Sequence, residues 1–278
     1  MAEKFLMVAP LTATAELKDE IETVVSKLKH IGLHILVMPV SDVVKGNQYL
    51  CSRDWISFEA GKVATVYPMS LLERQRERND LVFEILEQDG SEVSDVIDFT
   101  DAETEGIFLE GLSSIVLDRN AKVAYLSVSS VCDLDLFIEF CEELEYTPIV
   151  FNEEVSNENE VLKTSKIITI CKDFILVCST LIENKKERKL VLTHLKKSGR
   201  EIIYLDKNQI KSFAYDVVQC VGKGGDAFVL VSKTVFAVLK DDQKEKLKKY
   251  GAMEVIDCTT IEKFGNHSLG AMMNKIVE

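Results

Sequence analysis

Three segments of the chain end in the same way, with the sequences KHIG at residues 29–32, KKSG at 196–199 and KKYG at 248–251. Each closes a stretch whose apolar side chains recur at helical spacing, and a short apolar run follows each glycine. Glycine readily adopts the left-handed conformation that ends many helices, and short apolar runs between polar residues are typical of strands. We therefore predict a ββαβ-like unit that repeats along the whole chain.

The predicted strands are β-rich runs bounded by polar or turn residues. They lie at Phe5–Val8, His34–Met38, Lys62–Tyr67, Ser114–Leu117, Val123–Val128, Ile167–Ile170, Phe174–Cys178, Glu201–Tyr204, Ala227–Val231 and Met253–Ile256. Helical spacing predicts helices at Leu17–Ile31, at Leu136–Leu144 behind an Asp133 cap, at about 186–197 and 242–250, and in part of 71–86. Because only four prolines and no Ser/Gly linker occur, residues 1–278 are predicted to form one α/β domain.

Composition limits the classes of partner and compartment. The chain carries 33 basic and 46 acidic residues, a net charge of -13, which argues against nucleic acid or an anionic membrane as partner. No apolar run is long enough to span a membrane, and the first ten residues resemble a strand rather than a signal peptide. Seven scattered cysteines without a CxxC pair predict free, buried thiols, and four isolated histidines predict no metal site. We expect a cytoplasmic protein without a cofactor.

Several charged or glycine-rich stretches are interpreted structurally. Lys185–Lys189 and Lys244–Lys249 are expected to be solvated helix faces. Asp89–Glu105 is acidic and predicted to be a surface loop. Gly222–Asp226 lacks the phosphate-binding loop pattern and is predicted to be a hairpin loop.

Four segments, in order and with natural spacing, resemble the motifs of one superfamily. They run from Asp54-Trp55 through Tyr67-Pro68-Met69 to Arg78, from Leu109-Glu110-Gly111 to Tyr125, from Gln209 to Asp216, and from Thr260 to Met272. Together they are similar to the guanidine-modifying α/β propellers, or penteins, which include arginine deiminases, dimethylargininases, amidinotransferases and citrulline hydrolase relatives. The amidinotransferase-related, citrulline-hydrolase-like branch is the most similar. The resemblance implies five ββαβ modules around a pseudo-fivefold axis, with the site on that axis.

The superfamily's chemistry uses a cysteine thiolate that attacks a guanidinium or ureido carbon, a histidine that moves protons, and carboxylates that hold the substrate nitrogens. The resemblance implies that the carboxylate is kept as Glu110. It also implies that Lys163 stands where the family has its histidine, and Gly270-Ala271 where it has Arg-Cys.

Two further positions differ in the same comparison. Tyr215-Asp216 stands where the family has Gly-Asn, and Trp55 is kept. The family's aspartate ahead of the tryptophan is not evident, and Gln48 lies nearest. Tyr215 is expected to crowd the pocket.

These differences predict loss of chemistry. Ala271 has no nucleophile, and Lys163 is expected to stay protonated, to move protons poorly and to repel a guanidinium. The resulting prediction is a chain that is not an enzyme, a pseudoenzyme retained as a structural or protein-interaction subunit with unidentified protein partners.

Two alternative functions stay open. Glu110, Asp216 and Lys163 could hold a small zwitterion, such as an amino acid, in the axial pocket of a binding sensor. Alternatively, the chain could be a residual hydrolase that acts on C–N bonds of arginine- or citrulline-like substrates.

Individual side chains also have competing interpretations. A structural salt bridge between Glu110 and Lys163 is favoured over ligand binding, and His267 is interpreted as a loop residue rather than a catalytic one. Cys171, Cys220 and Cys258 are interpreted as core residues rather than replacement nucleophiles.

Overall fold

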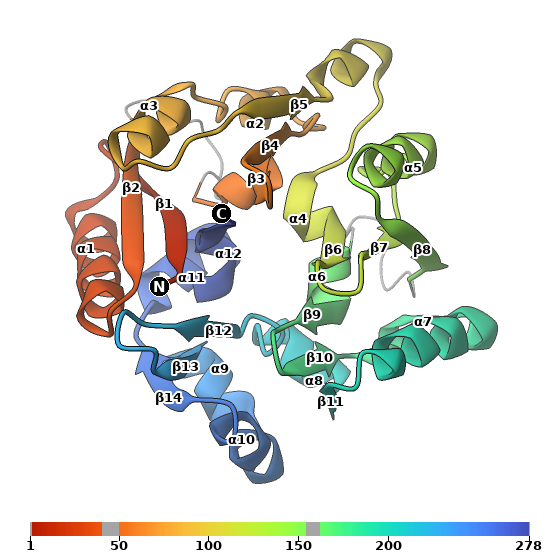
Figure 1. Cartoon of the computed structure of the whole chain (residues 1–278). Coiled ribbons are helices and arrows are strands. Elements are labelled where there is room, and N and C mark those ends of the chain that lie inside the picture. Colours follow the sequence, from red (N-terminus) through yellow and green to blue (C-terminus); the bar gives the residue numbers. More distant parts are fainter. Residues whose placement is uncertain (1, 41–49, 154–161, 278) are drawn as a thin grey trace.

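The computed structural model describes residues 2–40, 50–153 and 162–277. Within these ranges the strands form five three-stranded sheets, and Figure 1 shows them arranged in a ring. The predicted fold class, an α/β propeller of ββαβ modules, is therefore confirmed. Gln48 lies outside the described residues.

All five sheets are built in the same way, with an antiparallel pair followed by a parallel pair. The sheets are β15 (Asn274–Ile276), β1 (Lys4–Pro10), β2 (His34–Val40); β3 (Ile56–Glu59), β4 (Val63–Val66), β5 (Asp95–Asp98); β6 (Ile115–Asp118), β7 (Val123–Val128), β8 (Thr147–Asn152); β9 (Ile168–Ile170), β10 (Phe174–Val177), β11 (Glu201–Tyr204); and β12 (Val218–Val221), β13 (Ala227–Ser232), β14 (Ala252–Ile256). A helix connects each parallel pair, as a crossover between parallel strands requires.

The long helices lie on the outside of the ring, and several of the short ones lie near its axis (Figure 1). The outer helices are α1 (Ala15–His30), α3 (Leu81–Gln88), α5 (Leu134–Glu143), α7 (Lys185–Lys197) and α10 (Asp241–Lys248). The remaining helices are α2 (Leu72–Gln75), α4 (Gly111–Ser114), α6 (Thr164–Ile167), α8 (Lys207–Lys211), α9 (Lys233–Val238), α11 (Thr259–Gly265) and α12 (Leu269–Met272), with 3-10 turns η1 (Ser52–Asp54), η2 (Thr100–Glu105) and η3 (Ser179–Leu181). No helix in the described ranges is long and apolar enough to cross a membrane.

Helix α1 shows how the local sequence produces the outer layer. The Thr14 hydroxyl accepts a hydrogen bond from the backbone N–H of Leu17 and caps the first turn. Four apolar side chains at helical spacing, Leu17, Ile21, Val24 and Leu28, are buried against the first sheet. Gly32, with φ of +90°, then turns the chain into β2.

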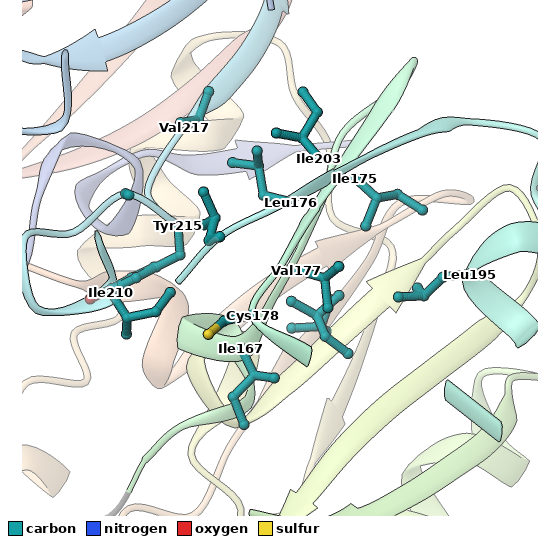
Figure 2. Packing of buried hydrophobic residues seen from close by; sticks show 14 of the residues in the cluster. Ile167, Ile175, Leu176, Val177, Cys178, Leu195, Ile203, Ile210, Tyr215 and Val217 are labelled. Carbon is teal, nitrogen blue, oxygen red and sulfur yellow. The ribbon is translucent and has the colours of Figure 1, made fainter. Parts of the chain in front are cut away.

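Apolar side chains from adjacent modules pack together in clusters. Figure 2 shows part of the largest, in which Ile175 and Val177 of β10 lie among Ile167, Ile203 and Leu195. These clusters fill the space between each sheet and its outer helix. They fix the relative positions of the short axial turns that lead into the inner strands.

Most predicted elements are confirmed, with ends shifted by one or two residues. Asp133 caps α5 by accepting from the N–H of Leu136 at 2.9 Å, and Gly222–Asp226 is the hairpin loop between β12 and β13. The prediction that Asp89–Glu105 is a loop is wrong, because this stretch contains β5 and η2. Its strand is an edge strand whose side chains are mostly exposed, so it carries no apolar pattern.

Candidate functional site

Five turns near the axis, each just ahead of an inner strand, carry the candidate residues. Asp54 ends η1 before β3, Glu110 precedes α4 and β6, and Lys163 precedes α6 and β9. Asp216 lies just before β12, and Ala271 lies in α12 before β15. Because α4 packs against both η1 and α6, and α12 packs against η1, the repeated fold brings these turns together.

A buried network, which we call the axial ion cluster, consists of Asp54, Arg74, Glu77, Glu110 and Lys163. The Lys163 Nζ lies 2.9 Å from Glu110 Oε2 and 3.3 Å from Asp54 Oδ2. The Arg74 guanidinium donates to Asp54 Oδ2 at 2.9 Å and to both Glu77 oxygens at 3.0 and 3.1 Å. The predicted pairing of Glu110 with Lys163 is therefore confirmed.

Opposing effects of burial and charge set the protonation of this cluster. Burial raises the pKa of Asp54 and Glu110, but Lys163 and Arg74 outweigh it, so both pKa values lie below the usual range. Burial lowers the pKa of Lys163, yet Asp54 and Glu110 bring it above the ordinary lysine value. Burial raises the pKa of Glu77 despite its bonds to Arg74. Lys163 is therefore a cation at neutral pH, as predicted, held between two carboxylates.

Glu110 is positioned by its neighbours. Its Oε1 accepts a 2.6 Å hydrogen bond from the Ser70 hydroxyl, so both oxygens are engaged. The next residue, Gly111, has φ of +36°, and a Cβ there would lie 2.4 Å from the Arg53 carbonyl oxygen and 2.6 Å from that of Asp54. Glycine at 111 thus allows the chain carrying Glu110 to approach the turn carrying Asp54.

Replacing Gly111 with Ala is expected to lower the free energy of unfolding by about 3 kcal/mol, since both the positive φ and the backbone contacts oppose a Cβ. Urea denaturation of the variant measures this loss. Gly61→Ala is the control, because Gly61 also has a positive φ but no atom of the described residues lies within 4 Å of the position that a Cβ would take. Equal losses in the two variants would contradict the close-approach explanation.

A second group of residues surrounds Ala271. Asp216 Oδ2 accepts from the backbone N–H groups of Ser268 at 3.1 Å and Ala271 at 3.3 Å. Burial raises the pKa of Asp216 to about 6. A Cβ at Gly270 would lie 2.1 Å from Asp216 Oδ1, so this position accommodates glycine while Asp216 keeps its place. Arg53 Nη1 donates to the Gly270 carbonyl at 3.3 Å, and its Nε is buried without a hydrogen-bond partner among the described residues.

His267 lies in this second group and is buried, between α11 and α12. The interpretation of His267 as a loop residue is confirmed, and the structure adds that its side chain is buried. Burial lowers the pKa of His267 to about 4, so the ring is neutral at pH 7. Its Nδ1 lies 3.5 Å from the Ser268 carbonyl oxygen, and its Nε2 has no hydrogen-bond partner in the part of the chain that the structure describes.

Two residues that the resemblance placed in the pocket are located in the core. Trp55 is buried with Leu6 and Val8 in an apolar cluster. Tyr215 packs in the cluster of Figure 2, near Ile210 and Val217. The expectation that its ring crowds the charged site is thus not met, because the backbone directs the ring into the core while Asp216 faces the axis.

All seven cysteines are free. Cys220 and Cys258 are buried in one apolar cluster, and Cys171 packs against another, as predicted. Cys51 and Cys132 interact electrostatically with Asp54 and Glu110 respectively. Burial raises the pKa of each of these thiols, so none is a thiolate at neutral pH.

Three members of the axial ion cluster, Asp54, Arg74 and Glu77, were missed by sequence reasoning. Asp54 stands directly before Trp55, whereas the resemblance places the family's aspartate further upstream. Arg74 and Glu77 lie within the first motif but were given no role. The sequence shows that an acid and an arginine flank a segment with two buried strands, but it does not show that Asp54 and Arg74 meet.

The sequence of the chain matches a known protein family. A sequence model of eukaryotic N,N dimethylarginine dimethylhydrolase matches residues 10–278. The chain belongs to this dimethylarginine dimethylhydrolase family. No match is found among curated protein sequences.

Solved structures share the fold at low identity. The cyanobacterial arginine dihydrolase ArgZ is 12% identical with a TM-score of 0.74, and the chain is covered completely but spans 40% of the ArgZ chain. The substrate-bound N-terminal domain of a mutant ArgZ is 10% identical, with coverage of 99% of this chain and 98% of that one and a TM-score of 0.74. A dimethylarginine dimethylaminohydrolase adduct is 12% identical, with coverage of 99% and 100% and a TM-score of 0.68.

The prediction that the chain is not an enzyme is wrong. It rested on the changes at Ala271, Gly270, Lys163 and Tyr215-Asp216, whereas the family that matches nearly the whole chain is a family of hydrolases. The predicted membership of the guanidine-modifying superfamily is confirmed by the same match.

Proposed function

We propose that this protein hydrolyses C–N bonds in small arginine- or citrulline-like molecules. The observation that carries the proposal is the convergence of Asp54 and Glu110, two buried carboxylates that are both ionised at neutral pH, on one nitrogen at the axis. Guanidino and ureido groups are planar and present several N–H donors, which such a pair of carboxylates can accept. Membership of the dimethylarginine dimethylhydrolase family supports the same substrate chemistry.

The cationic side chains beside this pair complete the proposed site. Arg53 and Lys163 are only partly buried, and so is Ala271 nearby, whereas Asp54, Glu110 and Asp216 are buried. We therefore expect a substrate to reach the buried carboxylates from the side of these partly exposed residues. We assign the carboxylate of an amino-acid substrate to Arg53, because its buried Nε has no hydrogen-bond partner within the described ranges.

Water is the nucleophile in this proposal. Ala271 has no thiol, and the cysteines near the axis are protonated at neutral pH. Asp216, whose carboxylate contacts the backbone at 271 and has a pKa of about 6, is the proposed base. The oxygen of water bonds to the planar carbon, the C–N bond breaks, and the proton taken from water passes to the leaving nitrogen.

Turnover with and without the Glu110 carboxylate tests the proposal. The protein is incubated with arginine, dimethylarginine or citrulline, and released ammonia, methylamines and amino-acid products are quantified. Glu110→Gln is expected to lower kcat/KM by about 100-fold, because it removes a charge that holds the substrate nitrogens. Treatment with a thiol-alkylating reagent is expected to leave the rate unchanged.

Glu92→Gln is the matched control, since Glu92 pairs with Lys62 on the exposed surface. It should retain the full rate. Absence of turnover on all three compounds, or equal turnover by the wild-type and Glu110→Gln proteins, would refute the proposal.

A further inference from the structure

We propose that Lys163 makes this site selective for neutral ureido compounds over guanidinium compounds, an inference that rests on the proposed function. Its ammonium group lies 2.9 Å from Glu110 Oε2 and 3.3 Å from Asp54 Oδ2. These are the distances at which a cationic nitrogen bonds to carboxylates. The protein's own side chain therefore takes the place in which the same two carboxylates would hold a substrate cation.

The surrounding charges show why a second cation is disfavoured there. Asp54 is already shared between Lys163 and Arg74, and Glu77 is engaged by Arg74. Arg53 is cationic, and burial keeps His267 neutral, so neither adds negative charge. A guanidinium that bonds to Asp54 or Glu110 would thus lie beside the ammonium of Lys163, and the carboxylates of the axial ion cluster are already engaged by its two cations.

A ureido group fits the same arrangement without that repulsion. It is planar like a guanidinium but neutral, and its carbonyl oxygen can accept a hydrogen bond from Lys163 while its N–H groups donate to Asp54 and Glu110. When water adds to the ureido carbon, negative charge develops on that oxygen, beside the ammonium. Cleavage of the C–N bond transfers the proton from water to the leaving amine and releases carbamic acid, which decomposes to carbon dioxide and ammonia.

Binding of citrulline and arginine tests the inference, because the two amino acids have the same shape and differ in an oxygen and a charge. Dissociation constants are measured by calorimetry for the wild-type protein and for Lys163→Met. The wild-type protein is expected to bind citrulline more tightly, by about 100-fold, since a buried like charge disfavours arginine. Lys163→Met is expected to reverse the preference, because Glu110 then loses its nearest cation and Asp54 keeps only Arg74.

Lys122→Met is the matched control, since Lys122 packs over the Tyr146 ring and donates to the Leu144 carbonyl, away from the axial turns. It should keep the wild-type preference. Lys163→Gln serves as a second variant should the Met variant fail to fold by circular dichroism, because it removes the charge and keeps a donor.

The outcomes separate the two proposals. An unchanged ratio of affinities in folded Lys163→Met and Lys163→Gln overturns the role of Lys163, as does the absence of binding of either amino acid. Turnover of arginine in preference to citrulline overturns the role of Lys163 but leaves the hydrolase proposal standing. Binding with the expected reversal and no turnover supports the role of Lys163 and overturns the hydrolase.

Discussion

Replacing Arg74 with Met is expected to lower the free energy of unfolding by about 3–5 kcal/mol, the usual cost of removing one partner from a buried ionic network. Arg74 bonds to Asp54 and Glu77 and lies 3.9 Å from Glu110. Without it, three carboxylates remain buried around Lys163 as the single cation of the axial ion cluster. The loss is measured by urea denaturation at pH 7.

Arg78→Met is the control for this substitution. Arg78 lies on the same segment and pairs with both oxygens of Glu103, but its side chain is 23% exposed and faces one acid. Its loss is expected to be about 1 kcal/mol, in the range of partly exposed pairs. A similar loss of free energy of unfolding in both variants would show that the contribution of Arg74 to stability does not come from the buried cluster.

Replacing Asp216 with Asn is expected to change how stability depends on pH. Burial raises the pKa of Asp216 to about 6 and lowers that of His267 to about 4. Between these two values, lowering the pH of the wild-type protein raises the free energy of unfolding through Asp216 and lowers it through His267. In the variant only His267 remains, so the free energy of unfolding should fall by about 2–3 kcal/mol as the pH is lowered from about 6.5 to 4.5.

The sign follows from which state binds more protons. The raised pKa of Asp216 means that the folded protein takes up the proton first. The contribution of Asp216 to the free energy of unfolding therefore grows as the pH falls toward the ordinary value of 3.8. The lowered pKa of His267 means that the unfolded chain is protonated first, so its contribution is present above the ordinary value of 6.5 and is lost as pH falls toward 4.

His267→Gln provides the opposite test, because it removes the histidine and keeps Asp216 with its raised pKa. Its stability should rise on acidification over the same interval, as measured by denaturant unfolding at several pH values. Parallel pH profiles for the two variants would contradict the assignment of these protonation states. The carboxylates of the axial ion cluster are present in both proteins and therefore do not affect this comparison.

The fold could be predicted largely from the sequence because each module repeats the same signals. The apolar runs of β7 and β11 match their observed bounds, and the helix-ending glycines lie where the chain turns into the outer strands. Two of the strands that were missed, β5 and β15, depend on backbone pairing more than on side-chain pattern. β5 has the polar sequence Asp-Val-Ile-Asp at a sheet edge, and β15 has only three residues.

The site could be predicted in part. The resemblance identified Glu110 and Lys163, and the structure shows that they form an ion pair. Asp54 and Arg74 required the three-dimensional structure, because residues 20 positions apart meet through the segment that connects η1 to α2. The expectation for Tyr215 failed because sequence position does not show that adjacent residues point to opposite sides, as Tyr215 and Asp216 do.

The pairing of β15 with β1 has a consequence for how the protein is made. Lys4 pairs with Ile276, so β1 receives its second neighbour from a strand near the other end of the chain. While a ribosome synthesises the four intervening sheets, β1 carries one open edge. Unpaired strand edges bind other strands and promote aggregation. β1 therefore keeps this unpaired edge until β15 has been synthesised, and the edge exposes the first module to aggregation during that time.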